Sequence, residues 1–169
     1  MDKFEDMVLT REPSDSEAGK LAQKAANRDH SPYLDLFLYL ADRVEHTEQI
    51  KRWLSEGKNV LCDRYWGSTA AYQAAAEDID LSYIEYIQEN FIHEPDLTVL
   101  FDVEPEVSIE RIGNRDIKSK YERIDYLQKV RKNYQLLAER HDWVTVDASN
   151  PLKEVKENVY SLIEKEISR

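Results

Sequence analysis

Four short apolar runs alternate with longer segments of helical periodicity along the chain. The apolar runs cover residues 7–10, 60–62, 97–103 and 143–146. Between them, apolar residues recur at intervals of three and four, as they do in amphipathic helices. The clearest of these segments cover residues 33–53, 106–112, 127–138 and 155–163. Short strands that alternate with helices predict an α/β fold, with a parallel sheet flanked by helices.

Charged residues follow each of the four predicted strands. They include Arg11, Asp63, Arg64, Asp102 and Asp147. Ligands of parallel sheets bind beyond the carboxyl ends of the strands, so two arginines at equivalent strand ends can converge on one anion. Arginine suits phosphate because its planar fork donates two parallel hydrogen bonds. In the alternative, each arginine only pairs with the acidic residue beside it. The pattern predicts a site for a phosphorylated ligand, with or without a metal ion.

Three further features suggest nucleotide chemistry. Asp63 directly follows an apolar strand, like the Walker-B acid that holds magnesium through water. Tyr39 and Arg43 share a helix face, so the ring could stack on a base while the guanidinium bonds its edge. The alternative, an aromatic core residue beside a surface arginine, is commoner for this spacing. The charge run over 110–125 is either a solvated connection or a basic flap that closes over phosphates.

Composition narrows the class of protein. The chain has 169 residues, enough for one domain, and a formal net charge of -11, which argues against broad binding to nucleic acid or anionic membranes. The single cysteine, Cys62, fits a reducing compartment and the role of a small buried hydrophobe. No apolar run approaches the roughly 20 residues of a membrane helix, and the first residues do not form a signal peptide. We therefore expect a soluble, cytoplasmic protein.

These motifs occur together in one family. The segments TREP, LFLYLADRVEH, GKNVLCDRYWGSTAAYQ, EPDLTVLFDVEPEVSIERI and VDAS, in this order and spacing, resemble thymidylate kinase from Val8 to about Ile163. The DRY segment followed by Ser, Ala-Tyr and Gln is highly specific, whereas DRY alone is not. The resemblance implies one P-loop-kinase-like domain over residues 1–169, with a lid at about 113–123. It also implies transfer of a phosphoryl group from ATP to deoxythymidine monophosphate (dTMP), with Mg²⁺, to give dTDP and ADP.

Carried over residue by residue, the resemblance assigns roles to the site. Arg11 and Arg64 resemble the clamps on the acceptor phosphate, and Asp63 resembles the acid near the metal and the sugar. Tyr39 occupies the place of the ring that stacks on thymine, and Arg43 that of the arginine that bonds the base edge. The other assigned residues are Tyr72 at the 2′ position of the sugar, Ser68 and Gln73 around the base, Arg115 in the lid as a catalytic phosphate ligand, and Asp147, Ala148 and Ser149 beside the adenine.

One element of the family pattern is missing from the 169 residues. The family begins with a strand, a glycine-rich phosphate loop that ends in Gly-Lys-Ser/Thr, and a helix. This sequence has no such loop motif, its four glycines are scattered, and residues 2–6 resemble only the end of that helix. The missing piece amounts to about 30 residues or more, one strand–helix unit.

Three explanations are open for the missing loop: a truncated or mis-set start, further residues outside this sequence, or a short variant without kinase activity. We favour the first two, because every other site position is intact. We expect the 169 residues alone to have little kinase activity. The alternative functions are a non-catalytic nucleotide-binding remnant and a kinase for another nucleoside monophosphate. We also expect a homodimer, with neither nucleic acid nor a membrane as a partner.

Overall fold

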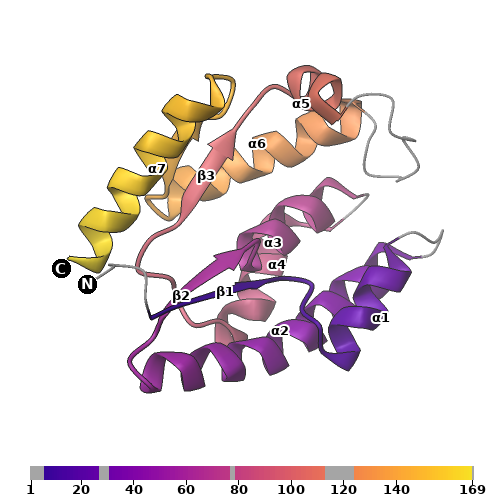
Figure 1. Ribbon diagram of the computed structural model, residues 1–169. Helices are drawn as coiled ribbons and strands as arrows, with labels where there is room; N and C mark the ends of the chain where they lie inside the picture. The colour runs from indigo at the N-terminus through magenta and orange to yellow at the C-terminus, as the bar shows by residue number, and fades with distance from the viewer. Residues whose placement is uncertain (1–5, 27–30, 77–78, 113–123, 169) are drawn as a thin grey trace. The chain divides into compact units, whose positions relative to one another are not determined.

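The structure, a computed structural model, describes residues 6–26, 31–76, 79–112 and 124–168. The chain divides into two compact units, Met1–Glu94 (unit 1) and Pro95–Arg169 (unit 2) (Figure 1). In both units a pair of parallel strands is covered by helices. This arrangement confirms the predicted α/β class with parallel strands and flanking helices.

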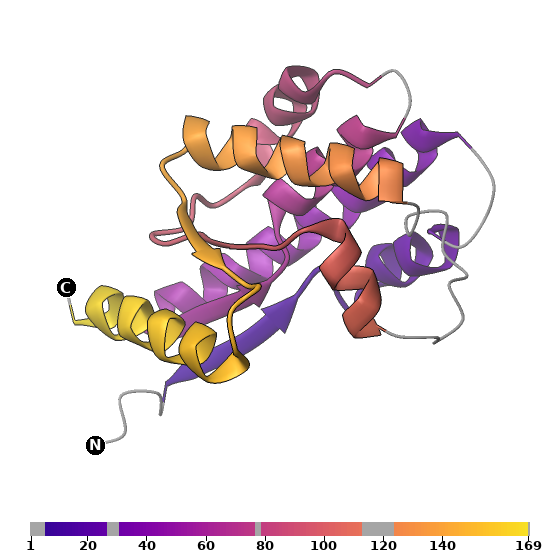
Figure 2. The same ribbon diagram turned by 90° about the horizontal axis from the view of Figure 1, so that it is seen from above.

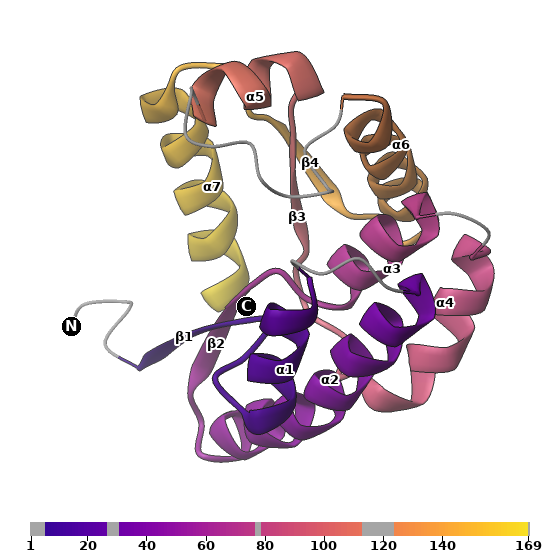
Figure 3. The same cartoon turned by 90° about the vertical axis from the view of Figure 1, so that its right-hand side faces the viewer.

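Unit 1 is built around the parallel pair β1–β2. Its elements are β1 (Met7–Arg11), α1 (Glu17–Ala25), α2 (Pro32–Ser55), β2 (Asn59–Asp63), α3 (Trp66–Ala75), α4 (Leu81–Gln88) and the 3-10 turn Glu89–Phe91. Parallel strands need a crossover connection, which α1 and α2 supply here. These two helices lie side by side in Figure 3, and α3 packs against α4. The sequence pattern predicted α2 but did not single out α1, α3 or α4.

The apolar spacing in the long helix α2 predicts only part of the face that the helix buries, which includes Ile50. Leu34, Phe37 and Val44 recur at helical spacing but are exposed. The buried face carries Leu36 and Leu40 together with several polar and charged side chains. Because those polar groups find partners inside unit 1, the helix can bury them and leave an apolar stripe outside.

The turn after β1 is fixed by one buried carboxylate from α2. Asp42 accepts hydrogen bonds from the Ser14 amide at 2.7 Å and from the Ser16 hydroxyl at 2.8 Å. The Ser16 hydroxyl also caps α1 by accepting from the Gly19 amide. A Cβ at Gly19 would lie only 2.2 Å from the Ser14 carbonyl oxygen, so this close approach of turn and helix requires glycine.

Unit 2 repeats the strand–helix pattern. Its elements are β3 (Val99–Asp102), α5 (Pro105–Ile112), α6 (Ile124–Arg140), β4 (Val144–Asp147) and α7 (Leu152–Ile167). The strands β3 and β4 are parallel, with Asp102 opposite Asp147, and α6 and α7 cover opposite faces of the pair (Figures 2 and 3). Leu137, Val146 and Val155 form part of its core.

All four predicted strands and the four clearest predicted helices are confirmed. The described strands form two separate pairs, β1–β2 and β3–β4. The predicted lid at 113–123 and most of the predicted helix end at 2–6 lie outside the described residues. The single domain therefore stays a prediction. Within the described segments, none of the helices has both the length and the apolar character that a membrane crossing requires.

Candidate functional site

The ends of β1 and β2 bring together three of the predicted charged residues. Arg11 is opposite Asp63 in the parallel register, and Arg64 follows directly. All three side chains are exposed. Arg11 lies 3.6 Å from the Asp15 carboxylate, but both groups are solvated and such a pair contributes little stability. The neighbouring Glu12 is buried and binds other groups, so it does not serve as the alternative partner of Arg11.

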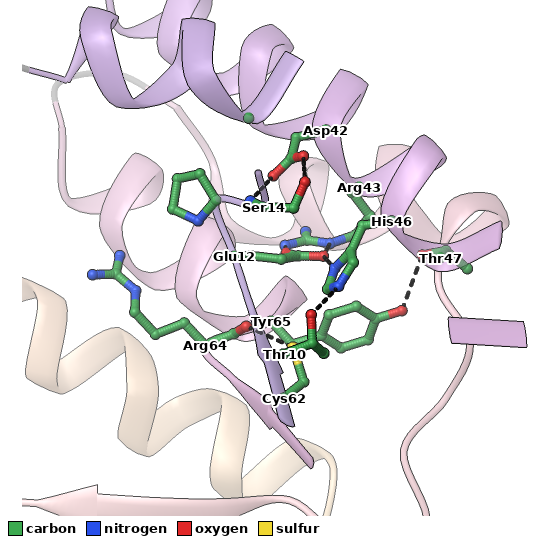
Figure 4. Close-up of polar contacts among 12 residues, drawn as sticks. Thr10, Glu12, Ser14, Asp42, Arg43, His46, Thr47, Cys62, Arg64 and Tyr65 are labelled. Atoms are coloured by element: carbon green, nitrogen blue, oxygen red, sulfur yellow. Dashed lines mark hydrogen bonds and ion pairs between the residues drawn. The ribbon is translucent and has the colours of Figure 1, made fainter. Parts of the chain in front are cut away.

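Arg64 combines an unusual backbone with an aromatic contact. Its φ is 64°, in the left-handed region that favours glycine. Residues other than glycine that are held in this region cluster at functional sites. The guanidinium carbon lies 4.9 Å from the centroid of the Tyr72 ring on α3, which is a cation–π distance. In Figure 4 the side chain of Arg64 points away from the buried groups around Glu12.

Tyr39 on α2 joins the same cluster. Burial raises the pKa of its hydroxyl, and the positive charge of Arg64 opposes that shift. Asp35 and Tyr72 raise the pKa of Tyr39 further. Because Arg64 and Tyr72 both act on Tyr39, and Arg64 lies over the Tyr72 ring, these three side chains from α2, the end of β2 and α3 lie close to one another. The three predicted residues therefore border one region of unit 1.

Arg43 lies inside unit 1, where it is only 1% exposed. Its Nε donates to Glu12 Oε1 at 3.3 Å, Nη2 donates to Glu12 Oε2, and Nη1 donates to Gln88 Oε1 at 2.8 Å. Its guanidinium carbon lies 5.0 Å from the centroid of the Tyr65 ring. The alternative in which this residue is a surface arginine is wrong. A charge buried this deeply must be paired, and the carboxylate of Glu12 meets that need.

Sequence reasoning missed three polar residues around Arg43. Glu12 binds both Arg43 and His46, which lies on the next turn of α2 (Figure 4). Gln88, at the end of α4, accepts a hydrogen bond from Arg43. Glu12 directly follows Arg11 at a strand end, a position that could have marked it. The other two carry no signal in the sequence, because their partners lie more than 30 residues away.

Ser68 and Gln73 are both buried on α3. The Ser68 amide donates to the Tyr65 carbonyl oxygen at 2.9 Å in the first turn of the helix. The Oε1 atom of Gln73 is buried and accepts no hydrogen bond from the residues that the structure describes. A buried acceptor of this kind is costly unless a ligand or water satisfies it. Its position on α3, directly after Tyr72, makes it a candidate contact for a ligand.

Unit 2 holds the predicted Asp147, Ala148 and Ser149 in the turn after β4. The Ser149 hydroxyl and amide donate to Asp147, at 2.5 and 2.8 Å, and lower the pKa of that carboxyl. Arg111 on α5 donates to the carbonyl oxygens of Ala148 and Ser149, at 2.5 and 2.9 Å. Arg111 belongs to the charge run over 110–125, for which the sequence predicted no role at this turn. In the structure it fixes the shape of this turn.

The carboxylates that follow β3 are held by α6. Arg131 donates to Asp102 through Nε at 2.7 Å and through Nη2 at 2.9 Å, and its Nη1 lies 2.5 Å from Glu104. The hydrogen bonds from Arg131 lower the pKa of Asp102. These carboxylates are therefore engaged inside unit 2.

The remaining predictions concern the lid and the metal. Arg115 lies outside the described residues. Within the described segments, no three His, Cys, Asp or Glu side chains gather as a metal site. A single exposed carboxylate such as Asp63 still fits magnesium, which is usually bound by one or two carboxylates together with substrate phosphates and water.

Comparison with known proteins gives the family. A family model described as thymidylate kinase matches residues 1–159. The chain belongs to the thymidylate kinase family. A probable thymidylate kinase of Archaeoglobus fulgidus is 44% identical over 157 residues, which cover 92% of this chain and 79% of that protein. Another, of Methanosarcina mazei, is 37% identical over 172 residues, covering 97% of this chain and 84% of that protein.

Other thymidylate kinase relatives agree. A probable thymidylate kinase of Pyrobaculum calidifontis is 37% identical over 162 residues, which cover 94% of this chain and 83% of that protein. The resemblance inferred from the sequence motifs is thus confirmed. Family membership identifies a nucleoside monophosphate kinase and supports the thymidylate kinase interpretation over both alternatives.

Proposed function

We propose that the chain transfers a phosphoryl group from ATP to dTMP, and that unit 1 binds the dTMP. The observation that carries this assignment is the cluster of Tyr39, Arg64 and Tyr72 beside the strand end that bears Arg11. It offers two exposed guanidinium groups for a phosphate and two rings for a nucleoside. The buried acceptor of Gln73 matches the N–H donor on the edge of a thymine.

On the donor side, the turn at Asp147, Ala148 and Ser149 is proposed to border the adenine of ATP. Its support is the pair of hydrogen bonds from Arg111, which hold the turn in one shape. Arg115 is proposed to bind the donor phosphates. Asp63 would hold magnesium, which neutralises charge on the transferring phosphoryl group when it is bound. Residues of this chain contribute chiefly by orienting the reactants, because phosphoryl transfer needs little covalent help.

Three further proposals concern the oligomeric state, the partners and the location of the protein. The exposed apolar residues Leu34, Phe37 and Val44 on α2 form a stripe that would suit a homodimer contact. The overall charge of -11 fits the proposed absence of nucleic acid and membrane partners. A cytoplasmic location agrees with the single cysteine.

The deciding experiment is titration calorimetry of the folded chain with dTMP and with uridine monophosphate. We expect dTMP to bind more tightly, because the Tyr72 ring would oppose a 2′-hydroxyl. This measurement needs no turnover, so it tests the acceptor site even if the 169 residues alone are inactive. Equal binding of both nucleotides, or binding of neither, would contradict the proposed acceptor site.

A further inference from the structure

The guanidinium of Arg43 is held in a single orientation by groups from several elements. Glu12, just past β1, binds Nε and Nη2 together, which fixes the plane of the guanidinium. Gln88 binds Nη1 at 2.8 Å from the end of α4, and the Thr69 hydroxyl lies 3.3 Å from Nη2. The Tyr65 ring covers one face. Rotation of Arg43 would break several of these contacts at once.

Glu12 is itself fixed by a second hydrogen bond. His46 Nδ1 lies 2.9 Å from Glu12 Oε1, and because a carboxylate oxygen only accepts, Nδ1 is the donor. His46 Nε2 lies 2.7 Å from the hydroxyl of Thr10. Figure 4 shows this chain running from Thr10 through His46 to Glu12 and Arg43. Both ends of the imidazole are therefore tied, and the carboxylate that orients Arg43 cannot swing away.

Gln88 fixes the Nη1 end of the Arg43 guanidinium, as Glu12 fixes Nε and Nη2. Its Oε1 accepts from Arg43, while its Nε2 donates to the Trp66 carbonyl oxygen at 3.3 Å, at the start of α3. The side chain is 0% exposed. The amide is thus held by α3 in the orientation that presents its oxygen, and not its nitrogen, to the guanidinium.

We propose that Glu12, His46 and Gln88 are positioning residues that set base specificity by fixing the direction of the Arg43 donors. This inference rests on the proposed function together with the role that the resemblance to thymidylate kinase implies for Arg43, a hydrogen bond to the edge of the base. An arginine offers only donors, so it pairs with the keto oxygen at position 4 of thymine and opposes the 4-amino group of cytosine. An Arg43 side chain with fixed donors disfavours cytosine, because its N–H groups then face the 4-amino group. A side chain free to rotate can move away from that group, so the site binds both bases.

The test compares binding of dTMP, deoxycytidine monophosphate (dCMP) and 2-deoxyribose 5-phosphate to variants of the full chain. His46→Leu and Gln88→Met each remove two side-chain hydrogen bonds at similar volume. We expect them to lower the ratio of dTMP to dCMP affinity by about tenfold, the size of one hydrogen bond from a charged group. Binding of 2-deoxyribose 5-phosphate, which has no base, should stay unchanged.

Two controls separate positioning from stability. His46→Asn places an amide donor near the position of Nδ1, so it should keep the affinity ratio within about threefold of the parent. Ile50→Val trims a buried residue one turn along α2 from His46 and removes no polar group, so it should leave the ratio unchanged. Arg43→Ala should lower the ratio at least as far as His46→Leu.

Each result has a defined consequence. An unchanged ratio in His46→Leu and Gln88→Met, with a lowered ratio in Arg43→Ala, would overturn the inference and leave the proposed function standing. A parallel loss of dTMP and 2-deoxyribose 5-phosphate binding would assign the cluster a purely structural role and also overturn it. No preference for dTMP in the parent chain would instead reject the proposed function.

Discussion

Burial separates the proposed site residues of unit 1 into two kinds. Arg11, Asp63 and Arg64 are exposed at the strand ends, where they can meet a phosphate or a metal without losing a buried partner. Arg43 is enclosed and held in place by Glu12 and Gln88. Exposed cations suit a phosphate that enters from water, whereas an enclosed and fixed donor suits the selection of one base.

The single thiol provides a residue-scale prediction. Burial, and secondarily Glu12, raises the pKa of Cys62 from 9.0 to about 12. A raised pKa keeps the thiol protonated, so the thiolate fraction at pH 8 is about a thousandfold below that of an ordinary thiol. Reaction with Ellman's reagent should therefore be slower by about that factor than in the urea-unfolded chain. The rate should rise about tenfold per pH unit from 7 to 10, and a plateau near pH 9 would show that the thiol is not shielded.

The ends of strands are easier to predict than contacts between helices. The sequence pattern placed Arg11 and Arg64 at equivalent ends of two parallel strands, and the register agrees, because Arg11 lies opposite Asp63, the residue before Arg64. The contacts of Arg43 with Glu12 and Gln88 join residues 31 and 45 positions apart. Such pairs depend on how helices pack, and helical periodicity alone does not contain that information.

At the scale of elements, periodicity predicted the helix α2 but only part of its buried face, which includes Ile50. Leu34, Phe37 and Val44 have the spacing of a buried stripe, yet the helix buries the side with Asp42 and Arg43. Burial of charged groups is normally unfavourable, and it is tolerated here because each group has a partner. A pattern of apolar residues cannot indicate which polar side chains will find hydrogen-bond partners in the interior of the fold.

The link between α6 and β3 can be tested directly. Arg131→Met removes two hydrogen bonds to Asp102 and the ion pair with Glu104. We expect the free energy of unfolding at pH 7 to fall by about 1–2 kcal/mol, reduced from the value of a buried charged pair by partial exposure. Urea denaturation followed by circular dichroism measures the change, and Lys129→Met, an exposed substitution on the same helix, serves as the control.

The pH dependence of this effect has a definite sign. Arg131 lowers the pKa of Asp102 below 3.8, so the stabilisation is present above that value and is lost as the pH falls through the lower folded-state value. The difference in stability between the parent and Arg131→Met should therefore narrow on acidification from pH 7 to pH 3. A constant difference would show that packing of the arginine stem, and not the ion pair, is responsible.

For the whole molecule, the proposed homodimer gives a prediction about mass. If the stripe on α2 forms the contact, Phe37→Asp places a charge in an apolar interface and should convert the dimer to a monomer. Light scattering after size-exclusion chromatography measures the mass. Tyr86→Asp, on an exposed part of α4, is the matched control and should leave the dimer intact. If only Tyr86→Asp dissociates the dimer, the contact lies on α4 and not on α2. A parent chain that is monomeric would contradict the proposed homodimer.

The left-handed backbone of Arg64 has a consequence for directed evolution of this enzyme. A residue other than glycine held at this φ lowers the stability of the fold by about 1–2 kcal/mol, and a glycine avoids this strain. A library of variants selected only for yield or heat tolerance should therefore enrich glycine at position 64, although this discards the guanidinium over Tyr72. A library selected for turnover should keep arginine there. The residue found at position 64 should therefore differ between the two selected libraries.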